Sequence, residues 1–268
     1  MVTLMIPTRM AFPRRVGAVV ERNVKAMRVG PSYWVLLFSG IVEPLLYLLS
    51  IGVGVGALIE RPMSYRGEAI RYAEFVGPGM LAFSAMSGAL SEAIFTFFGK
   101  MKYARVFDLT FAATVRPSEI ATAELVWAAV RAAFYSALFL GVMVALDLTT
   151  IGWALAALPA TVLVGLSFSA MGLAVAALLR GWQDLELVTT AQVTLFLFSG
   201  TFSPVDQYPL VVQGLVELTP LYHAVELVRA MTLGAPHPGL LIHVGYLLAM
   251  VPLGLYFATR RIDRVLRH

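Results

Sequence analysis

The sequence predicts an all-α membrane protein with about six transmembrane helices. Two features of its composition support this: 59% of the 268 residues are hydrophobic, and only 13% are charged. A soluble domain is about half apolar and a quarter charged, so this chain carries more apolar surface than water tolerates. The apolar residues also gather in runs close to the roughly 20 residues that a helix needs to cross a bilayer.

Residues 1–33 are predicted to form a cytoplasmic segment that contains an interfacial helix. From Pro13 to Gly30, valines recur on one helical face, while arginines and Lys25 occupy the other. A basic amphipathic helix beside a spanning segment lies in the membrane interface. A charged face packed on other protein is the alternative. The first apolar run begins near Trp34, too late for a cleavable signal peptide.

Residues 34–268 are predicted to form a six-helix transmembrane domain. Its spans are Trp34–Leu58, Phe75–Phe98, Ile120–Leu146, Trp153–Leu179, Leu187–Phe202 and Leu240–Ala258. The fifth span is short because Pro204 and Pro209 stop it. The segment from Pro209 to Pro238 is too polar to span the membrane and too apolar for an ordinary loop. We therefore expect two short helices, broken at Pro220, that form an external re-entrant hairpin.

The basic residues indicate the orientation of the chain. Most of the 20 Lys and Arg residues lie in the N-terminal segment, in the loop between the second and third spans, and in the C-terminal tail. This asymmetry predicts that both termini are cytoplasmic. The excess of arginine over lysine favours a bacterial protein, hence the bacterial cytoplasmic membrane. No basic groove with interleaved aromatic residues is evident, so nucleic-acid binding is not expected.

Four ionisable residues fall inside the predicted spans: Glu43, Glu92, Glu124 and Arg131. Their positions along the helices put Glu43 and Arg131 near mid-membrane, and we expect these two to form an ion pair. Glu92 and Glu124 fall in the inner leaflet, and their role stays open; if they are close, one is protonated. A proton relay is the alternative, but one balanced pair leaves no chain of carboxylates across the membrane.

Enzymatic sites are not expected in this chain. Gly99-Lys100 lacks the upstream glycine of a P-loop, so ATP, if used, is bound by another chain. Ser167 and His243 occupy the same spans as the serine and histidine of rhomboid proteases. Phe168, however, follows the serine where those enzymes have glycine, so Ser167 fits better as a small packing residue. The chain has no cysteine, which excludes disulfides and cysteine metal sites.

Two groups of short motifs carry a resemblance. The first is FSGTFSP from Phe198 to Pro204, followed by Tyr208-Pro209 and by PLYH from Pro220 to His223. The second is FVGPGM, starting at Phe75. Together they resemble the NodJ and daunorubicin-resistance type of ABC export permeases, over nearly the whole chain in length and charge placement. Ser203 and Tyr208 depart from the usual phenylalanine and leucine, which leaves the substrate open.

The resemblance implies the membrane-spanning subunit of an ATP-driven exporter. Its cargo would be an amphiphile (a lipid, lipo-oligosaccharide or hydrophobic drug) that leaves the cytoplasm or inner leaflet. A second permease subunit, identical or related, and two cytoplasmic ABC ATPase subunits would complete it, with ATP and Mg²⁺ on the ATPase subunits and no cofactor on this chain. A proton-coupled secondary transporter and an intramembrane enzyme remain alternatives.

The resemblance also assigns two groups of residues. A coupling helix between Lys100 and Arg116 would dock on the ATPase through Lys102, Tyr103, Arg105, Val106, Phe107 and Asp108. A basic membrane anchor with interfacial aromatics fits the same loop. The second and fifth spans would line the path with soft and aromatic side chains: Met80, Phe83, Met86, Phe95, Phe196 and Phe198. The same spacing also fits plain packing.

Overall fold

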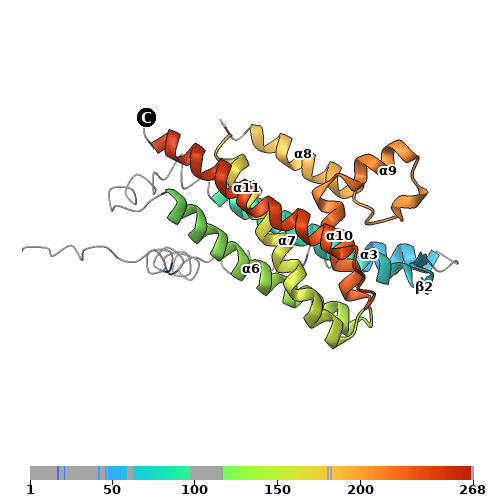
Figure 1. Cartoon of the computed structure of the whole chain (residues 1–268). Coiled ribbons are helices and arrows are strands. Elements are labelled where there is room, and N and C mark those ends of the chain that lie inside the picture. The colour runs from blue at the N-terminus through green and yellow to red at the C-terminus, as the bar shows by residue number, and fades with distance from the viewer. Residues whose placement is uncertain are drawn as a thin grey trace, which may run out of the picture.

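The computed structural model describes residues 48–58, 63–96, 117–179 and 183–266, together with Gly17, Glu21, Val42, Leu46 and Gly181. In this part the chain is built mainly from helices, as predicted (Figure 1). Most of the interfacial helix and of the first predicted span, and the whole of residues 97–116, lie outside the described residues.

Three helices of the described part are long and apolar enough to cross a membrane. They are Ala121–Ala145 within α6 (Pro117–Ala145), α7 (Ile151–Ala176), and Leu240–Arg261 within α11 (Leu240–Leu266). These coincide with the predicted third, fourth and sixth spans. α3 (Tyr72–Ser91) and its π-helical continuation η3 (Glu92–Thr96) cover most of the second. The total of six spans stays a prediction.

The helix in the fifth predicted span is shorter than expected. α8 covers Asp184–Leu197, so it begins before Leu187 and ends well before Phe202. Its 14 residues give about 21 Å of helix, less than the roughly 30 Å of a hydrocarbon core. The apolar run continues past Leu197, but Gly200 has a φ of 71° and turns the chain. Within α8, only Leu185 and Phe196 are buried.

A small β-hairpin precedes α3 and was not predicted from the sequence. β1 (Met63–Tyr65) pairs antiparallel with β2 (Glu68–Ile70). The two loop residues, Arg66 and Gly67, have φ values of 53° and 85°. Positive φ at both central positions is typical of the type I′ turn that joins two-residue hairpins. The π-helical η1 (Leu48–Val55) and the short η2 (Gly56–Leu58) come before it.

The two short helices expected around Pro220 are present. After the single turn η4 (Val205–Gln207) come α9 (Leu210–Glu217) and α10 (Pro220–Thr232). The Thr219 hydroxyl accepts a hydrogen bond from the Tyr222 backbone N–H at 3.3 Å and so caps α10. Pro220 takes the first helical position, where a missing N–H removes no helical hydrogen bond.

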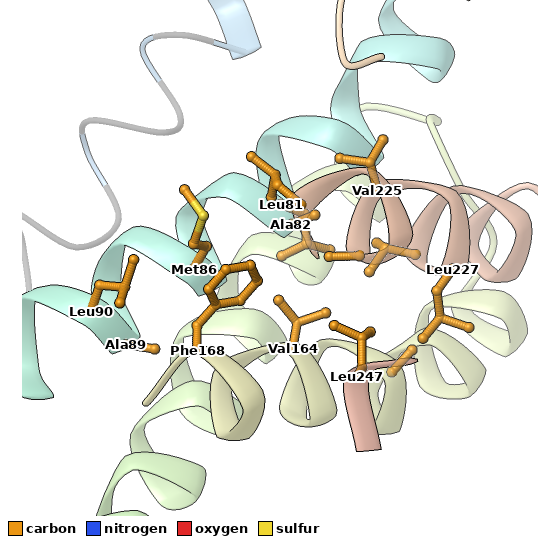
Figure 2. Packing of buried hydrophobic residues seen from close by; sticks show 14 of the residues in the cluster. Leu81, Ala82, Met86, Ala89, Leu90, Val164, Phe168, Val225, Leu227 and Leu247 are labelled. Atoms are coloured by element: carbon orange, nitrogen blue, oxygen red, sulfur yellow. The ribbon is translucent and has the colours of Figure 1, made fainter. Parts of the chain in front are cut away.

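α7 is the central helix of the bundle, because it packs against α3, α6, α10 and α11. Figure 2 shows buried apolar side chains of α3, α7, α10 and α11, with Val164 and Phe168 of α7 facing Met86 of α3 and Leu247 of α11. Small residues allow the close packing. A Cβ on Gly254 of α11 would lie 2.5 Å from the carbonyl carbon of Ala170 on α7. The small-residue stretch around Ser167 is therefore a helix-packing surface, as predicted.

Candidate functional site

A fully buried arginine lies near one end of the bundle. Arg229 of α10 is 1% exposed, yet the surrounding core is apolar. Its Nε donates to the carbonyl oxygen of Phe75 at 3.1 Å, and its Nη2 donates to the carbonyl oxygen of Gly200 at 2.8 Å. Its Nη1 pairs with Glu226 Oε1 at 2.5 Å. These contacts supply the partners without which a buried charge is strongly destabilising.

Aromatic and hairpin residues surround the guanidinium. Its central carbon lies 3.9 Å from the centre of the Phe75 ring, a cation–π geometry. The Tyr65 hydroxyl of β1 donates to Glu226 Oε2 at 3.3 Å. Burial, and next the charge of Glu226, raise the pKa of Tyr65 to about 12. The phenol therefore keeps its proton at neutral pH and ties the hairpin to α10.

The turn after α8 supplies one carbonyl of this site. Gly200 is restricted to glycine by its positive φ and by Val205, whose Cγ2 would lie 2.6 Å from an added Cβ. Ser199 Oγ donates to the Phe196 carbonyl oxygen at 2.8 Å and contacts Thr201 Oγ1 at 2.7 Å. Because the Ser199 proton is already used, Thr201 donates in the second bond. Both hydroxyls are thus satisfied in the core.

The same turn packs directly on the start of α3. A Cβ on Gly79 would lie 2.7 Å from Cγ2 of Thr201, so only glycine fits at this contact. Gly79 belongs to the FVGPGM motif, Gly200 and Thr201 to FSGTFSP, and Arg229 to the helix that PLYH begins. Motifs far apart in the sequence therefore meet at one place. We call it the Arg229 cluster: Tyr65, Phe75, Gly79, Gly200, Thr201, Glu226 and Arg229.

A histidine pair lies beside this cluster, between α10 and α11. Nδ1 of His223, the last residue of PLYH, lies 2.7 Å from Nδ1 of His243. One of the two nitrogens donates and the other accepts. The His223 ring also stacks on Tyr246, with the ring centroids 4.0 Å apart. The Ser167 hydroxyl lies 2.7 Å from the Leu163 carbonyl oxygen and 2.8 Å from that of Leu247. These contacts join helices and do not build a serine–histidine dyad.

The predicted mid-membrane arginine has a described partner, and it is Glu92. Arg131 Nη1 forms an ion pair with Glu92 Oε2. Glu43, the predicted partner, lies outside the described residues, so that pairing stays a prediction. The six predicted ATPase-contacting residues, Lys102 to Asp108, also lie there. In the described part, no group of three or more His, Asp or Glu side chains is placed to hold a metal ion.

The predicted pathway residues have different environments. Met80 and Met86 are buried in the core. Phe83 stacks on the buried Phe196, with ring centroids 4.0 Å apart. Phe198 is 49% exposed. The Phe95 side chain lies outside the described part. A pathway role for any of them stays a prediction.

Sequence reasoning missed Arg229, Glu226 and Tyr65 as members of a site. The available signal was an arginine close to the PLYH motif in a segment too apolar for a loop. Its i, i+3 spacing to Glu226 resembles that of an ordinary solvated ion pair. The contacts with Phe75 and Gly200 join residues distant in sequence, so spacing could not indicate them.

Comparison with known proteins places these features in a family. Residues 14–233 match the family described as ABC-2 type transporter. The chain is 34% identical over 229 residues to nodulation protein J of Rhizobium leguminosarum bv. trifolii, covering 85% of this chain and 86% of that protein. It is 31% identical over 253 residues to nodulation protein J of Sinorhizobium fredii (strain NBRC 101917 / NGR234), covering 92% of each. The chain belongs to the ABC-2 type transporter family, as a membrane permease of the nodulation protein J type.

Proposed function

We propose that this chain is the membrane-spanning subunit of an ATP-driven exporter of amphiphilic molecules, with ATP hydrolysed by two separate ABC ATPase subunits. Family membership supports a transporter subunit. The observation that carries the proposal is the Arg229 cluster, because the motifs that typify such permeases contact one another there. A second permease subunit, identical or related, completes the complex.

The orientation follows from α11. Its last turns carry Arg260 and Arg261, and the basic tail continues beyond them. The positive-inside rule puts this end in the cytoplasm. The opposite end of α11 carries His243, which contacts α10. The Arg229 cluster then lies toward the outer surface, and residues 97–116 lie on the cytoplasmic side.

The α9–α10 pair is the external re-entrant hairpin. The Tyr246 hydroxyl donates to the Leu218 carbonyl oxygen at 3.0 Å. Tyr246 lies about 9 Å along α11 from Leu240, at 1.5 Å per residue. The junction of α9 and α10 is therefore beside the span rather than beyond its end. Leu210, Val211 and Leu215 of α9 are 84%, 76% and 63% exposed, which suits contact with outer-leaflet lipid.

An amphiphilic cargo fits the open surface of α8. This helix exposes Leu187, Val193 and Leu197 together with the side chains of Thr190 and Thr194. Apolar surface interrupted by hydroxyl groups suits a molecule with an acyl chain and a polar head. We assign the cargo's path to this surface and to the adjoining face of α3, with the second permease subunit enclosing it.

Dependence on an ATPase separates this function from proton-coupled transport. The Glu92 carboxylate pairs with Arg131 on another helix, the arrangement of an ion pair that joins helices, and this supports the exporter. We expect proteoliposomes with the chain and its cognate ATPase to export a fluorescent acylated oligosaccharide on ATP addition. Liposomes without the ATPase should not export it.

The docking segment is tested in the same liposomes. Val106→Asp with Phe107→Asp should abolish permease-stimulated ATP hydrolysis and export while leaving membrane insertion intact. The matched control, Ser64→Asp, adds a carboxylate at an exposed position of the hairpin and should keep both activities. Export driven by a proton gradient without any ATPase would refute the exporter and establish the secondary transporter.

A further inference from the structure

An ion pair joins the η3 end of α3 to the middle of α6, within the predicted second and third spans. Glu92 begins η3, and Arg131 lies at the midpoint of α6. Their side chains are 19% and 18% exposed. The Arg131 guanidinium also lies 5.6 Å from the centre of the Tyr135 ring. The neighbours along α6 are mostly alanine, valine and aromatic residues, so the pair interrupts an apolar surface.

Stability alone is a weak reason for this pair. A charge inside the membrane is costly, and apolar replacements of a buried ion pair are often neutral or stabilising. An ion pair does, however, fix which residue of one helix lies opposite which residue of another. Glu92 also stands where α3 changes to a π-helical turn, a feature frequent at functional sites.

Ala93 and Ala132, which directly follow the two charged residues in sequence, both pack against glycines of α7. A Cβ on Gly172 of α7 would lie 2.8 Å from Cβ of Ala93, and one on Gly165 would lie 2.5 Å from Cβ of Ala132. Gly165 and Gly172 are two helical turns apart, on one face of α7. α3 with η3, α6 and α7 therefore contact one another pairwise at this depth. We call these three mutually contacting helices the triangle. The Glu92–Arg131 ion pair is the polar contact between its α3 and α6 members.

This triangle lies between residues 97–116 and the Arg229 cluster, the two regions that must be connected if ATP hydrolysis drives transport. η3 and α6 are the elements that directly precede and follow residues 97–116, the proposed ATPase-docking segment. At its other end, α3 carries Phe75 and Gly79 of the Arg229 cluster. A displacement of residues 97–116 that is transmitted along α3 passes the triangle before it reaches the cluster.

We propose that the Glu92–Arg131 pair is a coupling element. It makes α3 and α6 move as one unit, so that ATP-driven displacement of residues 97–116 reaches the Arg229 cluster. This rests on the proposed function, because it requires an ATPase that docks there. Without the pair, the ATPase still docks and hydrolyses ATP, but the two helices shift separately and less cargo leaves per ATP.

The ratio of export to ATP hydrolysis tests this role. In proteoliposomes with the cognate ATPase and the fluorescent acylated oligosaccharide, Glu92→Gln and Arg131→Gln should each lower the ratio by about fivefold or more, while stimulated hydrolysis continues. Glu74→Gln is the matched control, because it removes a carboxylate paired with Arg71 at the start of the same helix. It should leave the ratio unchanged.

A covalent replacement distinguishes coupling from loss of folding. The chain has no cysteine, so Glu92→Cys with Arg131→Cys can be joined by a reducible bifunctional thiol reagent. Cross-linking should restore the ratio, and reduction should lower it again. A wild-type ratio in Glu92→Gln, or a ratio that stays low after cross-linking, overturns the coupling role. Failure of the proposed function is separate, because the wild-type chain would then export without ATPase.

Discussion

At Gly79, one methyl group decides whether α3 can pack on the turn after α8. A Cβ there would lie 2.7 Å from Cγ2 and 2.8 Å from Oγ1 of Thr201. Thr201 has little room to retreat, because it is fully buried and its hydroxyl is bonded to Ser199. We expect Gly79→Ala to lower the free energy of unfolding by about 1–3 kcal/mol, the usual cost of overpacking. Thermal unfolding in detergent, followed by tryptophan fluorescence, measures the effect.

Gly88 provides the control on the same helix. An added Cβ at Gly88 has no neighbour within 4 Å. Alanine is favoured over glycine in a helix by up to about 1 kcal/mol, so Gly88→Ala should leave the melting temperature unchanged or raise it. Equal losses in the two variants would mean that the contact with Thr201 is not the cause.

For single residues, the sequence predicts the position along a helix better than it predicts which side chain forms the contact. Arg131 is predicted to be a membrane-embedded charge from its place along an apolar helix, and the structure places it within a helix long and apolar enough to span. Its described partner is Glu92, on another helix, because helix rotation and tilt decide which charges meet. The motifs around Gly79 and Gly200 are likewise evident in the sequence. Their contact with each other appears only when the chain folds.

Among the elements, the best predicted are those with clear start and stop residues. Pro220 marks the break between α9 and α10. Hydrophobicity alone predicts one helix through the apolar run that includes α8. α8 ends earlier because the chain turns at Ser199 and Gly200. The β-hairpin has only an Arg-Gly turn as its signal. Its strands are too short for apolar alternation to stand out.

The exposed face of α9 makes the hairpin testable. Leu215 is exposed on an apolar surface, whereas the exposed Glu217 carries a carboxylate that accepts a hydrogen bond from Gln213. If α9 lies in the outer leaflet, a fluorophore on Leu215→Cys should be strongly quenched by brominated lipids. One on Glu217→Cys should be quenched much less. Similar weak quenching at both positions would place α9 outside the membrane.

At the scale of the whole molecule, α7 and α3 are the helices against which most of the other described elements pack. Within the described residues, α7 packs against α3, α6, α10 and α11, and a glycine or alanine of α7 lies at the close approach to α6, to η3 and to α11. α3 connects the Arg229 cluster to residues 97–116. Loops are brief between α6 and α7 and between α10 and α11, so the helices alternate in direction. Because the helices alternate, the side of the membrane on which one helix ends determines the orientation of the others.

The topology of the molecule depends on that alternation and on its basic residues. If the arginine-rich end of α11 is cytoplasmic, Leu240 lies at the outer surface, and α10 and the hairpin that Tyr65 ties to it lie there too. The absence of cysteine allows single cysteines to report this without interference. Ser64 is exposed on β1 and is a suitable outer position. His268, at the end of the basic tail, is the inner one.

In intact cells, a membrane-impermeant thiol reagent should label Ser64→Cys and leave His268→Cys unlabelled. Permeabilised cells should show labelling of both, which establishes that the inner cysteine is reactive. Labelling of His268→Cys in intact cells would reverse the topology. The Arg229 cluster would then lie on the cytoplasmic side, and residues 97–116 could not meet a cytoplasmic ATPase. The same result would remove the physical basis for coupling through Glu92 and Arg131, because the proposed displacement would have no point of entry.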